Sequence, residues 1–252
     1  MKMAVSYANS ALAVRADIET AHKAAWGHIA APATWLDGET RVVIAAETRN
    51  VAACALCAER KASLSPYTVE GEHDHLGALP ENYVELIHRI VSDPARIAER
   101  WVRSMLGDDL PDTHYVEIVG VVAHSICVDT FCDGIGVARH DLPESVPGEP
   151  ARVGPDGAAE DISWLPTVGP EAASDDLKKI YPGNIGDAPT APHVRRAMSL
   201  VPAEAQSFFA LNDAQYLPPE AMWQVDVNPR AIEKAQVELV ASRVSALNGC
   251  FY

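Results

Sequence analysis

A stretch rich in proline, glycine and acidic residues divides the chain into two unequal parts. Residues 141–192 hold nine of the 18 prolines and six of the 15 glycines, with ten acidic residues against three basic ones. Such a composition sustains neither a long helix nor a packed core of its own. We therefore expect an N-terminal helical unit over residues 1–140, a long connection over 141–192, and a C-terminal helical unit over 193–252. The apolar side chains expected to hold the connection against a neighbouring surface are Trp164, Leu165, Ile180 and Tyr181.

Helical spacing of apolar residues dominates both sides of this connection, and the alternation typical of strands is rare. Asn228 followed by Pro229 marks one helix start, with an N-cap residue before a proline at the first helical position. The sequence therefore predicts an all-α fold. The predicted helices cover residues 15–30, 39–64, 82–91, 94–106, 113–135, 193–211, a short segment after Pro218 and Pro219, and 229–247.

The charge balance restricts the kinds of partner that the chain can bind. The 252 residues carry a formal net charge of −15, and 48% of them are apolar. Nucleic acids and anionic membranes need clustered Lys and Arg, so we expect neither as a partner. No apolar run in the sequence approaches the roughly 20 residues of a membrane span, and the N-terminal residues lack the apolar core of a secretory signal. We therefore expect a soluble, cytoplasmic protein.

The sequence lacks the common cofactor and hydrolase motifs. It has no Gly-rich phosphate loop, no Gly-x-Ser-x-Gly turn and no His-Glu-x-x-His segment, so we expect no cofactor and no bound metal. Five cysteines are an odd number, and a reducing cytoplasm makes a framework of structural disulfides improbable. Any chemistry of these cysteines is therefore expected from individual thiols or local pairs.

Cys54 and Cys57 form the one complete Cys-x-x-Cys motif. On a continuous helix the two sulfurs would lie on adjacent turns of one face, which suits dithiol exchange or half of a metal site. Three interpretations remain open: a redox-active or resolving pair, two packed helical cysteines, or a zinc site completed by His73 and His75.

Cys250 occupies a second position where a thiol could react. It follows Asn248 and Gly249, residues that tolerate the left-handed conformation at a helix end. A cysteine just after such an end would lie at the start of the next helix, where free amide groups lower the thiol pKa. Glu238, on the preceding helix, could move the proton. The alternative is a buried cysteine at a frayed terminus.

A shift of 121 residues aligns this C-terminal segment with the predicted helix 113–135. Glu117 then corresponds to Glu238, and Asp129 corresponds to Cys250. Each glutamate precedes, by twelve residues, a point where a helix is expected to break and restart. We interpret the match as an internal duplication. In the first unit, Cys132 takes the place of the second sulfur, Asp129 can equally be an N-cap, and His124 is expected to be buried with a backbone partner.

The run EKAQVELVASRVSALNGCFY resembles the signature helix of the alkylhydroperoxidase-like, carboxymuconolactone-decarboxylase-related family. This resemblance implies an all-helical, oligomeric protein whose redox members reduce peroxides with a cysteine pair, while Glu and His relay protons. The matched positions are Glu238 and Cys250. The family pattern continues with a second cysteine at position 253 and a histidine at position 257. In the first unit, Glu117 and Cys132 match, but Asp129 and Gly136 depart from the pattern, which indicates a degenerate site.

The family that this chain resembles includes selenoproteins, which carry selenocysteine at the position of the second sulfur. Because UGA is also read as a stop, we expect residue 253 to be selenocysteine and the chain to continue beyond Tyr252. A deliberately shortened chain or a pseudogene are the alternatives. The codon after Tyr252 distinguishes these cases.

These observations predict a thiol- or selenol-dependent peroxide-reducing oxidoreductase. Its partners would be a small peroxide, a thiol electron donor and further copies of the chain. Residue 253 would attack the peroxide, Cys250 would resolve the product, and Glu238 would assist proton transfer. The alternatives are a decarboxylase-like enzyme acting on a small lactone, or a non-catalytic helical interaction protein. Fast thiol labelling near neutral pH would favour the redox interpretation over simple packing.

Overall fold

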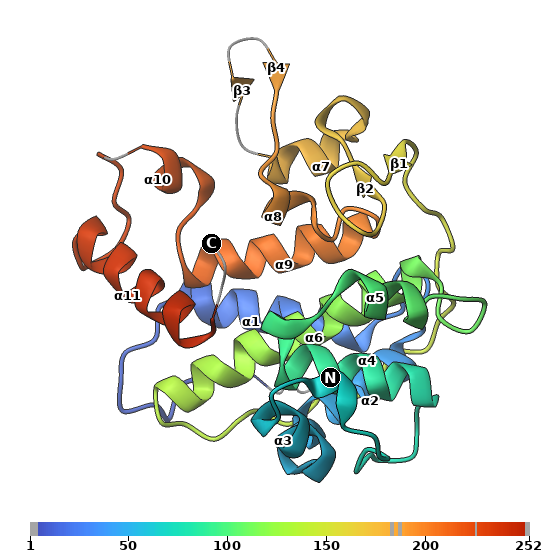
Figure 1. Ribbon diagram of the computed structural model, residues 1–252. Coiled ribbons are helices and arrows are strands. Elements are labelled where there is room, and N and C mark those ends of the chain that lie inside the picture. The colour runs from blue at the N-terminus through green and yellow to red at the C-terminus, as the bar shows by residue number, and fades with distance from the viewer. Residues whose placement is uncertain (1–4, 182–183, 186–187, 225, 250–252) are drawn as a thin grey trace.

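The computed structural model describes residues 5–181, 184–185, 188–224 and 226–249, and within them the chain is mostly helical (Figure 1). The prediction of an all-α fold is confirmed, because the strands present are short two-residue pairs. The α-helices are α1 (Ala16–Ala30), α2 (Gly38–Asn50), α3 (Ala55–Ala62), α4 (Glu81–Ser92), α5 (Glu99–Met105), α6 (Asp112–Gly134), α7 (Asp175–Ile180), α8 (His193–Arg196), α9 (Pro202–Gln215), α10 (Pro219–Trp223) and α11 (Lys234–Leu247).

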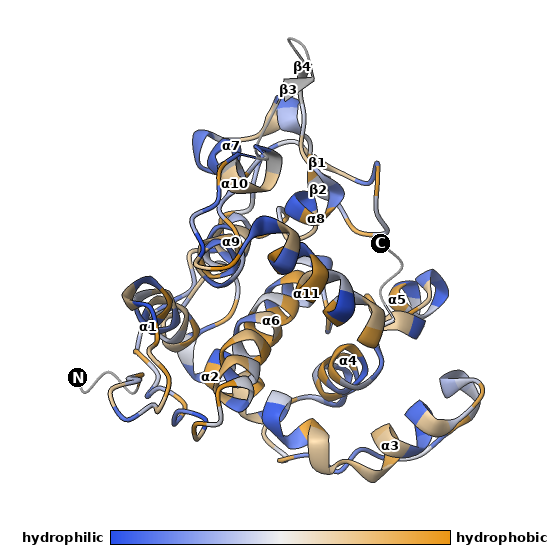
Figure 2. Ribbon diagram, turned by 90° about the vertical axis from the view of Figure 1, so that its left-hand side faces the viewer, coloured by the Kyte–Doolittle hydropathy of each residue, from blue (hydrophilic) through white to orange (hydrophobic). Residues whose placement is uncertain are grey.

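Helix α6 is the centre of the fold. It packs against α1, α2, α4 and α9, and α9 in turn lies along α1 (Figure 1). Apolar residues are concentrated on α6 and on the neighbouring α4 (Figure 2). By length and composition α6 is apolar enough to cross a membrane, which corrects the expectation that the sequence holds no such run. However, 67% of its most apolar window is buried inside the protein. That burial is typical of the core helix of a soluble protein.

A buried ion-pair network joins α6 to its neighbours. The Arg41 guanidinium on α2 donates to Glu117 on α6 at 2.8 Å and to Glu204 on α9 at 2.7 Å. None of these three side chains is exposed. His28, on α1, bonds Glu204 at 2.8 Å. Four helices thus meet at one cation, and the acidic side chains of α6 and α9 are compensated inside the core.

The predicted helix over residues 39–64 is divided in the structure. Helix α2 ends at Asn50, a 3-10 turn covers Val51–Ala53, and α3 begins at Ala55. Cys54 has extended backbone angles, with ψ at 118°. The Asp74 carboxylate accepts a hydrogen bond from the Ala55 amide at 2.8 Å, so a side chain from a distant loop satisfies the first amide of the new helix. This long-range contact is why the local pattern did not reveal the break.

Other predicted helices also begin or break differently from the sequence pattern. Residues 94–106 form a 3-10 turn, Pro94–Arg96, followed by α5, because the Arg96 side chain turns back to donate to the Ser63 and Arg60 carbonyls near the end of α3. The segment 193–211 is split into α8 and α9. The last helix, α11, starts after Glu233, where a capping box with Gln236 replaces the expected start at Pro229.

The connection over residues 141–192 wraps the helical body with short elements. It contains the antiparallel pair β1 (Ala158–Ala159) and β2 (Thr167–Val168), the 3-10 turn Pro170–Ala172, α7, and the hairpin of β3 (Asn184–Ile185) and β4 (Ala188–Pro189). Ile180 and Tyr181 are buried as predicted, and the Tyr181 hydroxyl donates to the Val168 carbonyl. Trp164 is 41% exposed, so its prediction as an anchor was wrong.

Helices α6 and α11, which the 121-residue shift aligns, lie in different surroundings. Most of α6 is buried in the main core, whereas on α11 it is Val237 that is buried. Val237 packs with Leu217 and Ala221 in a small separate cluster. Leu239 and Leu247 on α11 are largely exposed. The aligned helices therefore do not make equivalent packing contacts in this chain.

Candidate functional site

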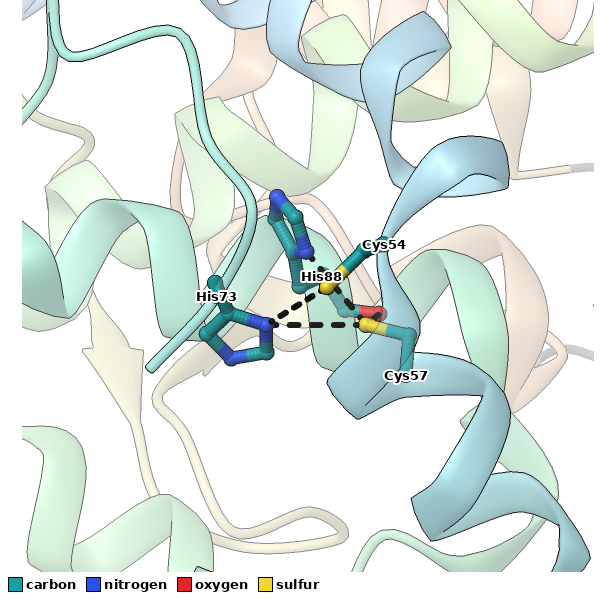
Figure 3. Close-up of side chains that lie close together, drawn as sticks. All are labelled: Cys54, Cys57, His73 and His88. Atoms are coloured by element: carbon teal, nitrogen blue, oxygen red, sulfur yellow. Dashed lines mark hydrogen bonds between the residues drawn. The ribbon is translucent and has the colours of Figure 1, made fainter. Parts of the chain in front are cut away.

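Two cysteines and two histidines meet at the edge of the helical body. Cys54 and Cys57 come from the start of α3, His73 from the loop before α4, and His88 from α4 itself (Figure 3). One donor atom from each of the four residues lies within 4.8 Å of the others. We call this group the thiol–histidine cluster.

The break between α2 and α3 places both sulfurs at a helix start. Cys54 is the N-cap residue of α3, and Cys57 is the third residue of the helix. The nearby backbone amides of Cys57 and Asp74 help to lower the pKa of the Cys54 thiol. This is the arrangement that the sequence suggested for Cys250, where a thiol faces the free amides of a new helix. The structure shows it at Cys54.

The contacts between sulfur and imidazole are close. His73 Nδ1 lies 3.4 Å from Cys54 Sγ and 3.6 Å from Cys57 Sγ. His88 Nδ1 lies 3.3 Å from Cys57 Sγ (Figure 3). Each histidine thus directs the same ring nitrogen, Nδ1, toward the cysteine pair.

The opposite nitrogen of each ring meets a carboxylate. His73 Nε2 lies 2.8 Å from Glu85, and His88 Nε2 lies 2.9 Å from Glu47. Glu85 also accepts from the Arg60 guanidinium at 2.8 Å. The Leu76 amide donates to Glu47 at 3.0 Å. The two carboxylates therefore fix the orientation of both rings. Each ring can donate its Nε2 proton to a carboxylate while its Nδ1 atom points toward sulfur.

Burial and hydrogen bonding act in opposite directions on the pKa values of the cluster. Burial alone would raise the pKa of Cys54, but the Cys57 amide and His73 outweigh it and lower the pKa. Burial alone would lower the pKa of His73, but its contacts with Cys57, Glu85 and Cys54 raise the pKa to about 10. For Glu85, His73 and Arg60 outweigh burial and lower the pKa to about 2. Burial lowers the pKa of His88. The contacts within the cluster therefore shift Cys54 toward its thiolate form and His73 toward its protonated form.

A pocket of about 390 Å³ gives the sulfurs access to small molecules. Both cysteines line it, although the whole residues are only 2% and 4% exposed. The cationic side chains of Arg49, Lys61 and Arg139 also line this pocket, together with Asp129. The histidines are behind the sulfurs and do not line the pocket. A small reactant in the pocket would therefore meet sulfur first.

Glu117, predicted for the secondary site, is instead part of the core network around Arg41. Its carboxylate accepts from the backbone amides of Trp35 at 2.8 Å and Leu36 at 3.1 Å. Burial raises the pKa of Glu117, although Arg41 opposes this. These partners hold the carboxylate between helices, and Glu117 contributes to packing rather than to a thiol centre.

The expected helix break at Asp129 is absent, because α6 runs unbroken from Asp112 to Gly134. Cys132 is therefore about 22 Å along the helix axis from Glu117, at 1.5 Å for each of fifteen residues. Its fully buried sulfur contacts the Tyr7 hydroxyl at 3.6 Å. Asp129 is paired with Arg49 at 2.7 Å rather than capping a helix. The structure does not bring Glu117 and Cys132 into one site.

The predicted C-terminal site stays a prediction. Glu238 is exposed on α11, where its carboxylate accepts from the Tyr216 hydroxyl at 2.8 Å. Cys250 lies outside the described residues.

The sequence indicated part of the thiol–histidine cluster. The cysteine pair and His73 were candidates, whereas His88, Glu47 and Glu85 were not. His75, the other proposed zinc ligand, is exposed and lies outside the cluster. His88 follows Glu85 by three residues on an amphipathic helix, a spacing that could have drawn attention to the pair. The separate prediction for His124 is confirmed, because its buried ring bonds the Gly120 carbonyl at 2.7 Å.

The cluster has the groups needed for two kinds of chemistry. Neighbouring thiols beside a histidine can cycle between dithiol and disulfide, and two sulfurs with two imidazoles can bind a soft divalent metal. Comparison with known proteins does not decide between these: no family model matches this chain, and no curated protein or solved structure matches it.

Proposed function

We propose that this chain is a thiol-dependent, peroxide-reducing oxidoreductase whose reacting residues are Cys54 and Cys57. The observation that carries the proposal is that both sulfurs line an accessible pocket and contact His73 behind them. Paired thiols, a proton-carrying histidine and a route for a small reactant are the requirements for this chemistry.

In the first step, the Cys54 thiolate attacks the nearer oxygen of a peroxide in the pocket. Cys54 takes this role because amide groups of α3 and of the following loop stabilise its charge. The O–O bond breaks, Cys54 becomes a sulfenic acid, and the leaving alkoxide takes a proton to become an alcohol. Water in the pocket supplies that proton, while His73, which lies 3.4 Å from Cys54 Sγ and is held by Glu85 at 2.8 Å, stabilises the thiolate before the attack.

In the second step, Cys57 attacks the oxidised sulfur of Cys54. The two sulfurs lie within 4.8 Å of each other at the start of one helix. A disulfide forms, the hydroxyl leaves as water, and the two thiols have given two electrons to the peroxide. An external dithiol then restores the pair by thiol–disulfide exchange. The stoichiometry is one peroxide consumed for each disulfide formed.

Peroxide consumption by the reduced chain, with a dithiol donor and a metal chelator present, tests the proposal. Wild-type protein should consume peroxide catalytically. Cys54→Ser should abolish turnover, because the attacking sulfur is gone. Reduced Cys57→Ser, freed of dithiol before peroxide is added, should react once and then accumulate a sulfenic acid, which a dimedone adduct on Cys54 would reveal by mass spectrometry.

Cys127→Ser is the matched control. Cys127 is a thiol outside the cluster, and burial raises its pKa to about 11, so its removal should leave turnover unchanged. Turnover that survives in Cys54→Ser, or no turnover by wild-type protein, would contradict the proposal.

Three predictions from the sequence accompany this proposal. A second centre at Glu238, Cys250 and position 253 would add to the chemistry of Cys54 and Cys57, and sequencing the codon after Tyr252 tests it. The resemblance implies a homo-oligomer, which sedimentation of the purified chain tests. A cytoplasmic location agrees with a thiol pair that must be kept reduced.

A further inference from the structure

We infer that the reduced chain binds one zinc ion through Cys54, Cys57, His73 and His88. This inference does not depend on the proposed peroxide reduction, since it concerns binding to the reduced protein alone. It rests on the spacing of the four donor atoms, the carboxylates behind the two rings, and the closure of the site.

The distances between the donor atoms are close to the edge lengths of the tetrahedron that four ligands form around zinc. With Zn–S bonds of about 2.3 Å and Zn–N bonds of about 2.05 Å, a tetrahedral sulfur–nitrogen edge is about 3.6 Å. Three of the four sulfur–Nδ1 distances in the cluster are 3.4, 3.6 and 3.3 Å. The remaining pairs of donor atoms lie within 4.8 Å (Figure 3). An ion at the centre would need only small side-chain movements.

Both histidines are oriented as metal ligands usually are. A ligating imidazole commonly donates its second N–H to a carboxylate, which fixes the ring and increases the basicity of the ligating nitrogen. His73 has this contact with Glu85, and His88 has it with Glu47. Glu47 is itself held by the Leu76 amide and the Asn50 side chain. The same arrangement on two independent rings goes beyond what one proton relay needs.

The donor set favours zinc over harder cations. Two thiolates and two imidazoles in a tetrahedral arrangement suit zinc, whereas magnesium and calcium prefer oxygen ligands. The two thiolate charges would balance the charge of the ion. His88 is fully buried and the His73 side chain is 8% exposed, so the four protein donors leave little room for water. A closed site with four protein ligands is typical of structural zinc.

Zinc would join three separate segments of the chain. The ligands come from α3, from the loop before α4 and from α4. That loop, residues 69–80, contains no helix or strand. Binding would therefore strengthen the attachment of the loop to both helices, which the Asp74–Ala55 and His73–Glu85 contacts already provide, and it would keep the two thiols reduced until the ion leaves. Because ligating thiols and imidazoles lose protons, binding should also release protons.

Anaerobic titration with cobalt, followed by zinc, tests the inference. The reduced chain is first freed of metal with a chelator, and the chelator is then removed. One equivalent of Co²⁺ should produce the intense visible bands of tetrahedral cobalt, together with sulfur-to-cobalt charge-transfer bands. One equivalent of Zn²⁺ should bleach them, raise Tm and release protons into a weak buffer.

Variants assign the ligands. His88→Gln and Cys57→Ser should weaken cobalt binding at least tenfold and change the spectrum. Glu47→Gln should weaken it about tenfold to a hundredfold, because the carboxylate behind His88 is lost. His75→Gln is the matched control, since this exposed histidine is outside the cluster, and it should bind like wild-type protein. Circular dichroism would confirm that each variant retains its helices.

The inference fails if wild-type protein gives no tetrahedral cobalt spectrum, or if His88→Gln binds cobalt as tightly as wild-type protein does. The wild-type spectrum keeps the test decisive even when a variant does not fold. Failure of the proposed function would have a different signature, namely cobalt binding without peroxide turnover in the presence of chelator. The two experiments have no common readout.

Discussion

Arg41 is the residue whose loss should cost the most stability outside the thiol–histidine cluster. Arg41→Met leaves Glu117 and Glu204 facing each other in the core without a cation. Removing one partner of a buried ion pair costs about 3–5 kcal/mol, because the remaining charge is uncompensated. We expect a loss of this size in the free energy of unfolding, measured by urea denaturation.

Arg103→Met is the control for this prediction. Arg103 is 40% exposed, and its pair with Glu160 lies at the surface, so its loss should leave the free energy of unfolding nearly unchanged. Equal losses for the two variants would show that the Arg41 network does not stabilise the core.

His124 should make the protein less stable in mild acid. Burial lowers its pKa to about 4, with Glu204 opposing the shift and His28 and Arg41 adding to it. Its pKa in the unfolded chain is about 6.5. Its contribution is therefore complete above pH 6.5 and is lost as the pH falls toward 4, by about 3 kcal/mol at most.

Unfolding by urea at a series of pH values between 7.5 and 4.5 measures this effect. His124→Gln should lose less stability on acidification than wild-type protein, whatever its stability at pH 7.5. His75→Gln, at an exposed position, should keep the wild-type slope. A slope unchanged in His124→Gln would contradict the assignment.

At the scale of elements, Gly120 lets α6 and α9 approach closely. A Cβ atom at this position would lie 2.7 Å from Glu204 Cγ. Gly120→Ala should therefore cost about 1–3 kcal/mol through overpacking, despite the gain of about 1 kcal/mol in helix propensity. A methyl group at Gly27, within α1, would have no neighbour inside 4 Å, so Gly27→Ala should stabilise the protein by up to about 1 kcal/mol. Thermal unfolding of the two variants should give Tm changes of opposite sign, and a stabilising Gly120→Ala would disprove the close-approach argument.

The helix elements also show where local patterns suffice and where they do not. The sequence predicted α1, α4 and α6 to within a few residues, because their apolar spacing is continuous. It missed the break at Cys54, which depends on the Asp74 carboxylate twenty residues away, and the break after Arg96, which depends on carbonyls of α3. Contacts of this kind override helical propensity, and they are not visible in a local window.

For the molecule as a whole, we expect stability to be unevenly distributed. Helix α6 is packed on several sides, whereas α11 contributes only Val237 to a small separate cluster. Amides of α6 should exchange with solvent only when the whole protein unfolds, and amides of α11 should exchange through local opening. Hydrogen exchange followed by mass spectrometry, on a monomeric sample, measures both. Equal protection of the two helices would contradict the expectation.

The same scale explains how much of the site could be foreseen. The Cys-x-x-Cys spacing identifies Cys54 and Cys57 as candidates, and His73 was a candidate because it lies near them in the sequence. His88 is 31 residues from Cys57, and its role depends on how α4 packs beside α3. The secondary site failed for the opposite reason: Glu117 and Cys132 were aligned by sequence, but an unbroken α6 keeps them apart. The sequence shows which residues carry reactive side chains, whereas the fold determines which of those side chains lie close together.

The close fit of Gly120 against Glu204 has a consequence for related chains. A lineage that acquires a side chain at position 120 must shorten the residue at position 204, and a shorter carboxylate there no longer reaches Arg41 and His28 in the same way. Neither change is easily tolerated first. The two positions should therefore vary together during evolution, or not at all.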